Sequence, residues 1–233
     1  MTGRARIAVF ASGSGTNLQA ILDYVAARGE ERGGDVVLVA SDRANAGALE
    51  RARQAGGGIA AAVLRSTRTP DGCDPLALLR EHKVDFIALA GYLRLLPQDV
   101  VKEFPSRILN IHPALLPAFG GAGMYGERVH RAVLLSGARV SGATVHYVDE
   151  EYDRGPILAQ WPVPVLADDS VSSLAARVLK VEHVLYPRVI DAVASGRWRF
   201  DSRPQAVPEA ATFALMHWDE RRLVEDIENA FGL

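Results

Sequence analysis

Short apolar runs alternate with amphipathic stretches along the first half of the chain. Between the runs, apolar residues recur at helical spacing, as in the segment that contains Leu18, Ile21 and Val25. Regular alternation of strand and helix is typical of an α/β fold with a doubly wound, mostly parallel sheet. The runs that predict buried strands are 6–11, 36–40, 59–64, 84–90 and 108–111.

The second half of the chain departs from this pattern. Residues 140–148 alternate between two faces and residues 158–165 form a further apolar strand, which together predict an antiparallel extension of the sheet. A helix is expected at 126–136, and a long helix from Ser170 to about residue 195. The pattern does not decide which face of this long helix carries Glu182.

A glycine-rich loop follows the first predicted strand. Backbone amides at a helix start favour an anion, and the two glycines of Ser12–Asn17 allow a phosphate to approach closely. The loop lacks the Lys of a Walker loop and the third glycine of a dinucleotide fingerprint, so a monophosphate is the expected ligand. The alternative is a plain tight turn with a helix cap.

Asn110 and His112 lie at the carboxyl end of the fifth predicted strand. Side chains two residues apart share one face of a strand. An amide can donate a hydrogen bond to a developing oxyanion, and an imidazole can move a proton near neutral pH. The pair therefore predicts chemistry on a carbonyl group, and the alternative is a polar pair that caps the strand.

Other polar segments are expected at the same edge, where ligands of open α/β sheets bind. The loop 91–97 combines a glycine, an arginine and leucines, which suits a flat, partly polar ring. Residues 118–125 predict a mobile lid or binding loop. Asp153 precedes a Gly-Pro turn, and an aspartate held near His112 would orient the ring, raise its pKa and favour its protonated form.

Composition narrows the function classes. Of 233 residues, 48% are hydrophobic and 23% are charged, and a net charge of -2 gives no support for a nucleic-acid partner. The single cysteine excludes an intrachain disulfide and a cysteine metal cluster, and the histidines lack partners at metal-ligand spacing. No apolar stretch reaches membrane-spanning length, and the first apolar run is too short for a signal peptide. A cytoplasmic protein without metal or membrane partner is expected, as a monomer or homodimer.

Three motifs resemble those of the folate-dependent formyltransferases in order and spacing: residues 12–18, residues 110–117 and residues 153–157. The resemblance covers roughly residues 6–200 and is greatest to members that formylate glycinamide ribonucleotide in purine synthesis. It implies a formyltransferase, Rossmann-like catalytic domain over residues 1–200, with a mononucleotide-binding half (1–105) and a folate-cleft half (106–200). Residues 201–233 have no counterpart and predict a linker and a helical appendage, with a helix at 220–231.

The resemblance also implies the ligands and the chemistry. The formyl donor would be 10-formyltetrahydrofolate, and the acceptor would be the amine of N1-(5-phosphoribosyl)glycinamide, through a tetrahedral intermediate. Asn110 and a protonated His112 would hold the oxyanion, and Asp153 would orient His112. The implied substrate-binding residues are Gly15, Thr16, Asn17 and Glu182, and the implied folate-binding residues are Arg68, Leu93, Arg94, Leu95 and Leu96.

The chain departs from the family at Ala114, where a serine is common, and in the length of the stretch 120–124. Three other functions stay open. A methionyl-tRNA formyltransferase would be expected to continue further after Asp201, and a formyltetrahydrofolate hydrolase to carry an extra amino-terminal domain. A phosphate or nucleotide sensor would use only the glycine-rich loop.

Overall fold

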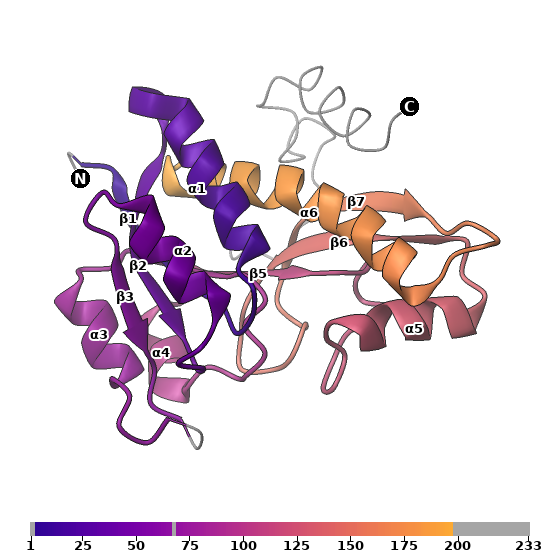
Figure 1. Ribbon diagram of the computed structural model, residues 1–233, viewed down its shortest axis with the longest axis horizontal. Helices are drawn as coiled ribbons and strands as arrows, with labels where there is room; N and C mark the ends of the chain where they lie inside the picture. Colours follow the sequence, from indigo (N-terminus) through magenta and orange to yellow (C-terminus); the bar gives the residue numbers. More distant parts are fainter. Residues whose placement is uncertain (1–2, 67–68, 198–233) are drawn as a thin grey trace.

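The computed structural model describes residues 3–66 and 69–197. This part of the chain is built on a seven-stranded sheet in the order β3-β2-β1-β4-β5-β6-β7 (Figure 1). The strands β1 to β5 run parallel, β6 pairs antiparallel with β5, and β7 pairs antiparallel with β6, which confirms the predicted fold class. The strands are β1 (Ala5–Phe10), β2 (Gly34–Ser41), β3 (Ala60–Val63), β4 (Phe86–Leu89), β5 (Ile108–His112), β6 (Val140–Tyr147) and β7 (Ile157–Pro164).

Helices cover both faces of the sheet, as a doubly wound fold requires. One apolar cluster joins α1, α2, α5 and α6 to the sheet, and a second joins α3 and α4 to the opposite face. The helices predicted at 126–136 and from Ser170 to about residue 195 are confirmed to within about two residues. The helices are α1 (Thr16–Arg28), α2 (Gly47–Ala55), α3 (Pro75–Glu81), α4 (Gln98–Glu103), α5 (Glu127–Ser136) and α6 (Val171–Ala194), with a short 3-10 helix at Gly29–Glu31.

The structure does not test the predictions for the carboxyl-terminal segment or for the two halves of the catalytic domain. The expected linker and appendage at 201–233, with its predicted helix at 220–231, lie wholly outside the described residues. The division of residues 1–200 into a mononucleotide half and a folate-cleft half stays a prediction.

The strand order reverses at β1, which lies between β2 and β4. Ligands of open α/β sheets bind at such a switch point, beyond the carboxyl ends of the strands. Here the loops after β1 and β4 are joined directly, because the Ser12 N–H donates to the Gly91 carbonyl at 3.0 Å. The fold therefore brings the glycine-rich loop beside the loop that follows β4.

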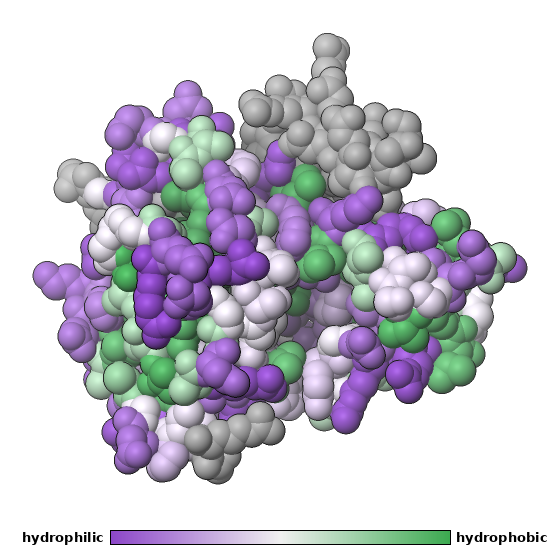
Figure 2. All heavy atoms as spheres, in the orientation of Figure 1, coloured by the Kyte–Doolittle hydropathy of each residue, from purple (hydrophilic) through white to green (hydrophobic). Residues whose placement is uncertain are grey.

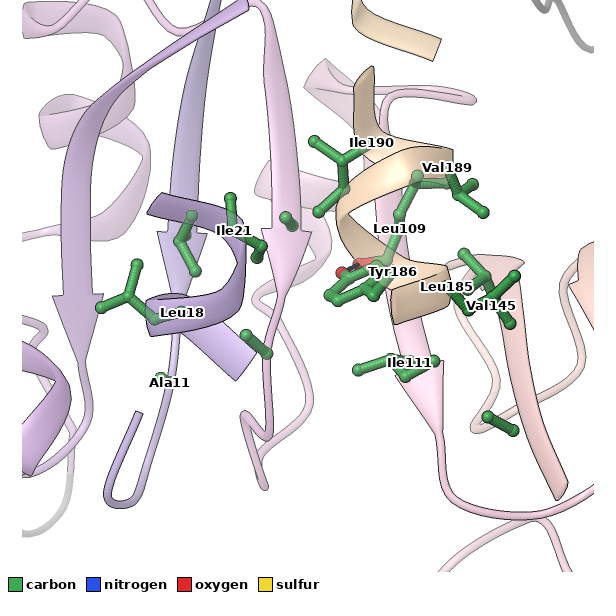
Figure 3. Close-up of a cluster of buried hydrophobic side chains, with 14 of the residues drawn as sticks. Ala11, Leu18, Ile21, Leu109, Ile111, Val145, Leu185, Tyr186, Val189 and Ile190 are labelled. Atoms are coloured by element: carbon green, nitrogen blue, oxygen red, sulfur yellow. Dashed lines mark hydrogen bonds between the residues drawn. The ribbon is translucent and has the colours of Figure 1, made fainter. Parts of the chain in front are cut away.

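The helix α6 connects this edge to the antiparallel strands. Ser170 begins it with a capping box, in which its side chain accepts from the N–H of Ser173. Figure 3 shows Tyr186 of α6 beside Leu109 of β5, within the apolar cluster. The fully buried Tyr186 hydroxyl lies 3.0 Å from the carbonyl of Leu89 and 3.1 Å from that of Leu109, so it bridges β4 and β5 immediately before Asn110.

Replacing Tyr186 with phenylalanine removes this bridge and leaves two buried carbonyl groups without their hydroxyl partner. We expect Tyr186→Phe to lower the free energy of unfolding by about 1–2 kcal/mol, because an unmade buried hydrogen bond carries that cost. Urea denaturation followed by circular dichroism measures the change. A variant as stable as the parent protein would show that the hydroxyl does not hold the two strands together.

Candidate functional site

A cavity of about 770 Å³ lies at the carboxyl ends of the parallel strands. This volume is within the range of small-molecule sites. The space-filling view shows a hollow between the part that carries α1 and α2 and the part that carries α5 (Figure 2). The cavity collects most of the residues singled out from the sequence: Asn17, Leu93, Arg94, Leu95, Leu96, Asn110, His112, Asp153 and Glu182.

Two of the other expected site residues are described and do not line the cavity. Gly15 and Thr16 are not among the residues that line the cavity, although Ser14 before them and Asn17 after them are. Arg68 lies outside the described residues, so its expected contact with folate stays a prediction.

The glycine-rich loop has the geometry of an anion site at the start of α1. Gly15 has φ +77°, and a Cβ there would lie 2.7 Å from the Cα of Ala48, so both its backbone conformation and its surroundings favour glycine. Among the described residues, no protein group accepts a hydrogen bond from the N–H of Ser14 or Gly15. Free amides at a helix start suit a phosphate.

Asn17 and Glu182 join α1 to α6 at the cavity wall. The Asn17 Nδ2 donates to the Glu182 Oε2 at 2.7 Å, and both side chains are buried. Burial raises the pKa of Glu182 to about 7, and the bond from Asn17 lowers it in part. Glu182 therefore sits on the buried face of α6, which its helical spacing alone did not decide, and it exchanges a proton near neutral pH.

The loop after β4 is fixed to the loop after β1 by side chains as well as by backbone. The buried Ser12 hydroxyl donates to the Asp42 carboxylate at 2.6 Å and accepts from the Leu93 N–H at 3.0 Å. Asp42 follows β2, so one hydroxyl connects segments after three neighbouring strands. This contact fixes the start of Leu93–Leu96 relative to the glycine-rich loop.

Asn110 faces His146 across the antiparallel pair of β5 and β6. The Asn110 Nδ2 lies 3.1 Å from the His146 Nε2, and the His146 Nδ1 lies 2.7 Å from the Tyr147 carbonyl. With the ring proton on Nδ1 donated to that carbonyl, Nε2 is free to accept from the amide. His146 thereby orients Asn110, with its Nδ2 beside the cavity.

His112 is held between two acceptors. Its Nε2 donates to the Phe119 carbonyl at 2.9 Å, and its Nδ1 lies 3.5 Å from the Asp153 Oδ2. Burial lowers the pKa of His112 more than Asp153 and the Phe119 carbonyl raise it, and His146 lowers it further. The expectation of a raised pKa is therefore wrong for this conformation: Asp153 acts in the expected direction, but the loss of water around the ring outweighs it.

Asp153 reaches both histidines from a tight turn. A Cβ on Gly155 would lie 1.9 Å from the Tyr147 carbonyl, so glycine lets the turn lie directly on the end of β6. The Asp153 Oδ2 accepts from the Gly121 N–H at 2.9 Å, and Oδ1 lies 3.5 Å from the His146 Nε2. Burial alone would raise the pKa of Asp153, but His146, His112 and the Gly121 N–H together bring it below its ordinary value. Asp153 is thus a carboxylate at neutral pH.

Two features of the site were not expected in full from the sequence. His146 contacts both Asn110 and Asp153, and only the register of β5 against β6 places it there. Phe119 and Gly121 belong to the expected lid 118–125, and they bond to His112 and Asp153 directly. The start of this loop is therefore part of the site. Among residues 3–66 and 69–197, no group of three or more His, Cys, Asp or Glu side chains could hold a metal ion.

The described helices include none long and apolar enough to span a membrane.

Comparison with known proteins agrees with this geometry. The family model described as formyl transferase matches residues 5–190. The chain is 50% identical over 208 residues to the chloroplastic phosphoribosylglycinamide formyltransferase of Arabidopsis thaliana. The aligned region covers 86% of this chain and 70% of the relative. It is 40% identical over 194 residues to the phosphoribosylglycinamide formyltransferase of Escherichia coli, covering 82% and 88% of the two chains.

A solved structure is also similar to this one. Glycinamide ribonucleotide transformylase 1 from Symbiobacterium toebii superimposes with a TM-score of 0.75 and 44% identity, over 87% of this chain and 93% of that one. The family match extends from β1 into α6 and so includes every strand of the sheet and the cavity that they support. The chain belongs to the formyl transferase family.

Proposed function

We propose that the protein transfers the formyl group of 10-formyltetrahydrofolate to the amine of glycinamide ribonucleotide in de novo purine biosynthesis. One observation carries the proposal: a single cavity joins a helix start with free amides to an amide–imidazole pair that is backed by a carboxylate. The related phosphoribosylglycinamide formyltransferases, up to 50% identical, support the same reaction.

Each ligand has a place in this proposal. The substrate phosphate binds at Ser14–Asn17, and Glu182 contacts the part of the ribonucleotide that lies between the phosphate and the amine. The pterin ring lies along Leu93–Leu96, with Arg94 beside it and Arg68 toward the tail of the folate. The formyl carbon then lies between the two ligands, next to Asn110 and His112, which line the same cavity.

The proposed reaction begins with a neutral His112, since burial lowers its pKa. The substrate ammonium gives one proton to the His112 Nδ1, which carries none while the Nε2–H donates to Phe119, and the neutral amine attacks the formyl carbon. The Asn110 Nδ2 donates to the oxyanion that forms, and the oxyanion replaces the Phe119 carbonyl as acceptor of the His112 Nε2–H. Asp153 stabilises the imidazolium from 3.5 Å. As the bond between the formyl carbon and N10 breaks, N10 of the leaving folate takes the second proton of the attached amine nitrogen, which becomes the amide of the product, and the imidazolium then releases its proton to water.

The test is to incubate the protein with 10-formyltetrahydrofolate and to follow tetrahydrofolate release spectroscopically. We expect release only when glycinamide ribonucleotide is present, with formation of the formylated ribonucleotide. Release without the amine would instead indicate a hydrolase, and release that requires methionyl-tRNA would indicate a tRNA formyltransferase. No release with any acceptor would favour a binding protein that uses only the glycine-rich loop.

Asn110→Ala removes the proposed oxyanion donor, and Asp153→Asn removes the charge that stabilises the imidazolium. We expect each change to lower kcat by about 100-fold or more, as loss of such groups does in other acyl-transfer enzymes. Asp149→Asn is the matched control, because Asp149 also lines the cavity, and within the described part of the chain its side chain bonds only to the backbone N–H of Glu151. Turnover near that of the parent protein in a folded Asp153→Asn variant would contradict the mechanism.

Glu182 predicts a pH dependence of stability. Its pKa is raised to about 7, so the folded protein retains a proton that the unfolded chain releases near pH 4.5. Stability is therefore highest below about pH 4.5 with respect to this group, and it falls by up to about 3 kcal/mol as the pH rises to about 7. Glu182→Gln should remove this part of the dependence in denaturation curves measured across that range. Parallel pH profiles for the variant and the parent protein would refute the assignment.

A further inference from the structure

The amino-terminal turn of α2 packs directly behind the glycine-rich loop. The Ala48 N–H donates to the Gly13 carbonyl at 3.2 Å, and a Cβ on Gly47 would lie 3.0 Å from the Ser14 carbonyl oxygen. Gly15 also lies close to Ala48. The conformation of the loop is therefore set by α2, a helix that does not itself line the cavity.

Arg51, one turn further along α2, makes the polar contact between helix and loop. Its Nε donates to the Ser14 carbonyl at 2.8 Å, and its Nη1 donates to the Gln19 Oε1 of α1 at 3.0 Å. The planar guanidinium thus spans the loop and the first turn of the following helix. Gln19 is itself held, because its N–H donates to the Gly15 carbonyl at 2.9 Å.

A bond to the Ser14 carbonyl has a defined consequence for the next amide. In a trans peptide the C=O and N–H point in opposite directions. When Arg51 fixes the Ser14 carbonyl toward α2, the Gly15 N–H of the same peptide must point away from α2. That N–H has no protein acceptor among the described residues, and the neighbouring Ser14 lines the cavity.

The charge of Arg51 is also available to an anion. Within residues 3–66 and 69–197, no carboxylate forms an ion pair with Arg51, whereas Arg53 on the same helix pairs with Glu50 at 3.3 Å. The nearby ionisable group is His183 of α6, whose pKa is lowered by burial and by Arg51. A cation that is partly buried attracts a phosphate dianion more strongly than a fully solvated cation does, because the effective dielectric constant around it is lower.

We propose that Arg51 is a positioning residue for the substrate phosphate, acting through the Ser14 carbonyl to direct the Gly15 N–H away from α2 and toward a phosphate bound beside Ser14. The proposal rests on the proposed function for the identity of the substrate, but not for the presence of a phosphate site. It places the determinant of phosphate affinity in α2, outside the cavity wall.

The test compares Arg51→Gln, Arg51→Lys and the matched control Arg53→Gln. We expect Arg51→Gln to raise KM for glycinamide ribonucleotide by about tenfold or more, while kcat and KM for 10-formyltetrahydrofolate stay within about twofold, since uniform binding of one substrate is lost. Arg51→Lys should fall between, because lysine retains the charge but not the planar fork. Arg53→Gln should match the parent protein.

Binding of inorganic phosphate, measured by calorimetry, gives a readout that does not depend on catalysis. Arg51→Gln should weaken it as much as it raises KM, with a melting temperature close to that of Arg53→Gln. An unchanged KM and phosphate affinity in folded Arg51→Gln would overturn the proposal, as would equal losses in kcat and in both KM values. If the parent protein transfers no formyl group but Arg51→Gln still binds phosphate more weakly, the proposal stands and the proposed function fails.

Discussion

The rest of the site depends on one constraint: the Asp153 carboxylate is charged and only 10% exposed, so it needs donors or positive charge nearby. Oδ2 accepts from the Gly121 N–H, and the two oxygens lie 3.5 Å from the His112 Nδ1 and the His146 Nε2, which become donors to the carboxylate when either ring is protonated. These partners come from the loop 118–125, from β5 and from β6. Satisfying one carboxylate thereby fixes the positions of three segments, and Gly155 allows the turn that carries it to lie on β6.

The same constraint decides how the two histidines differ. His146 gives its Nδ1 proton to a backbone carbonyl, so its Nε2 is available to Asn110. His112 has an acceptor at each ring nitrogen, which suits the charged form, yet burial lowers its pKa and keeps it neutral in the free protein. A neutral ring whose charged form is already provided with partners is well placed to accept a proton and to hold it during a reaction.

Two buried hydroxyl groups connect the strands that support the phosphate end and the folate end of the cavity. Ser12 connects the segments after β1, β2 and β4, and Tyr186 connects the ends of β4 and β5. Ser12 and Tyr186 are both buried, and neither is among the residues that line the cavity. The distance between the two proposed ligands is therefore set by the sheet and by α6, while Arg51 sets the direction of the amides at the phosphate end.

Much of this arrangement could be predicted from the sequence, for physical reasons. Apolar periodicity located the strands and helices, and the two-residue period of a strand placed Asn110 and His112 on one face. The register that sets His146 opposite Asn110 could not be predicted, because it depends on pairing between distant strands. The direction of the His112 pKa shift could not be predicted either. Burial lowers this pKa and Asp153 raises it, and only the packed structure determines which effect is larger. The role of Arg51 could not be recognised from the sequence, because arginines are common on surface helices.

The central proposal is that a single cavity holds the substrate phosphate at the start of α1 and the reacting formyl carbon beside Asn110 and His112. The most direct measurement is a crystal structure with glycinamide ribonucleotide and a folate analogue that cannot transfer its formyl group. The account predicts phosphate oxygens in hydrogen-bond contact with the Ser14 and Gly15 N–H groups, and the substrate amine about 3–3.5 Å from the formyl carbon next to the Asn110 Nδ2. A phosphate bound away from this loop, or an amine on the far side of His112, would contradict it.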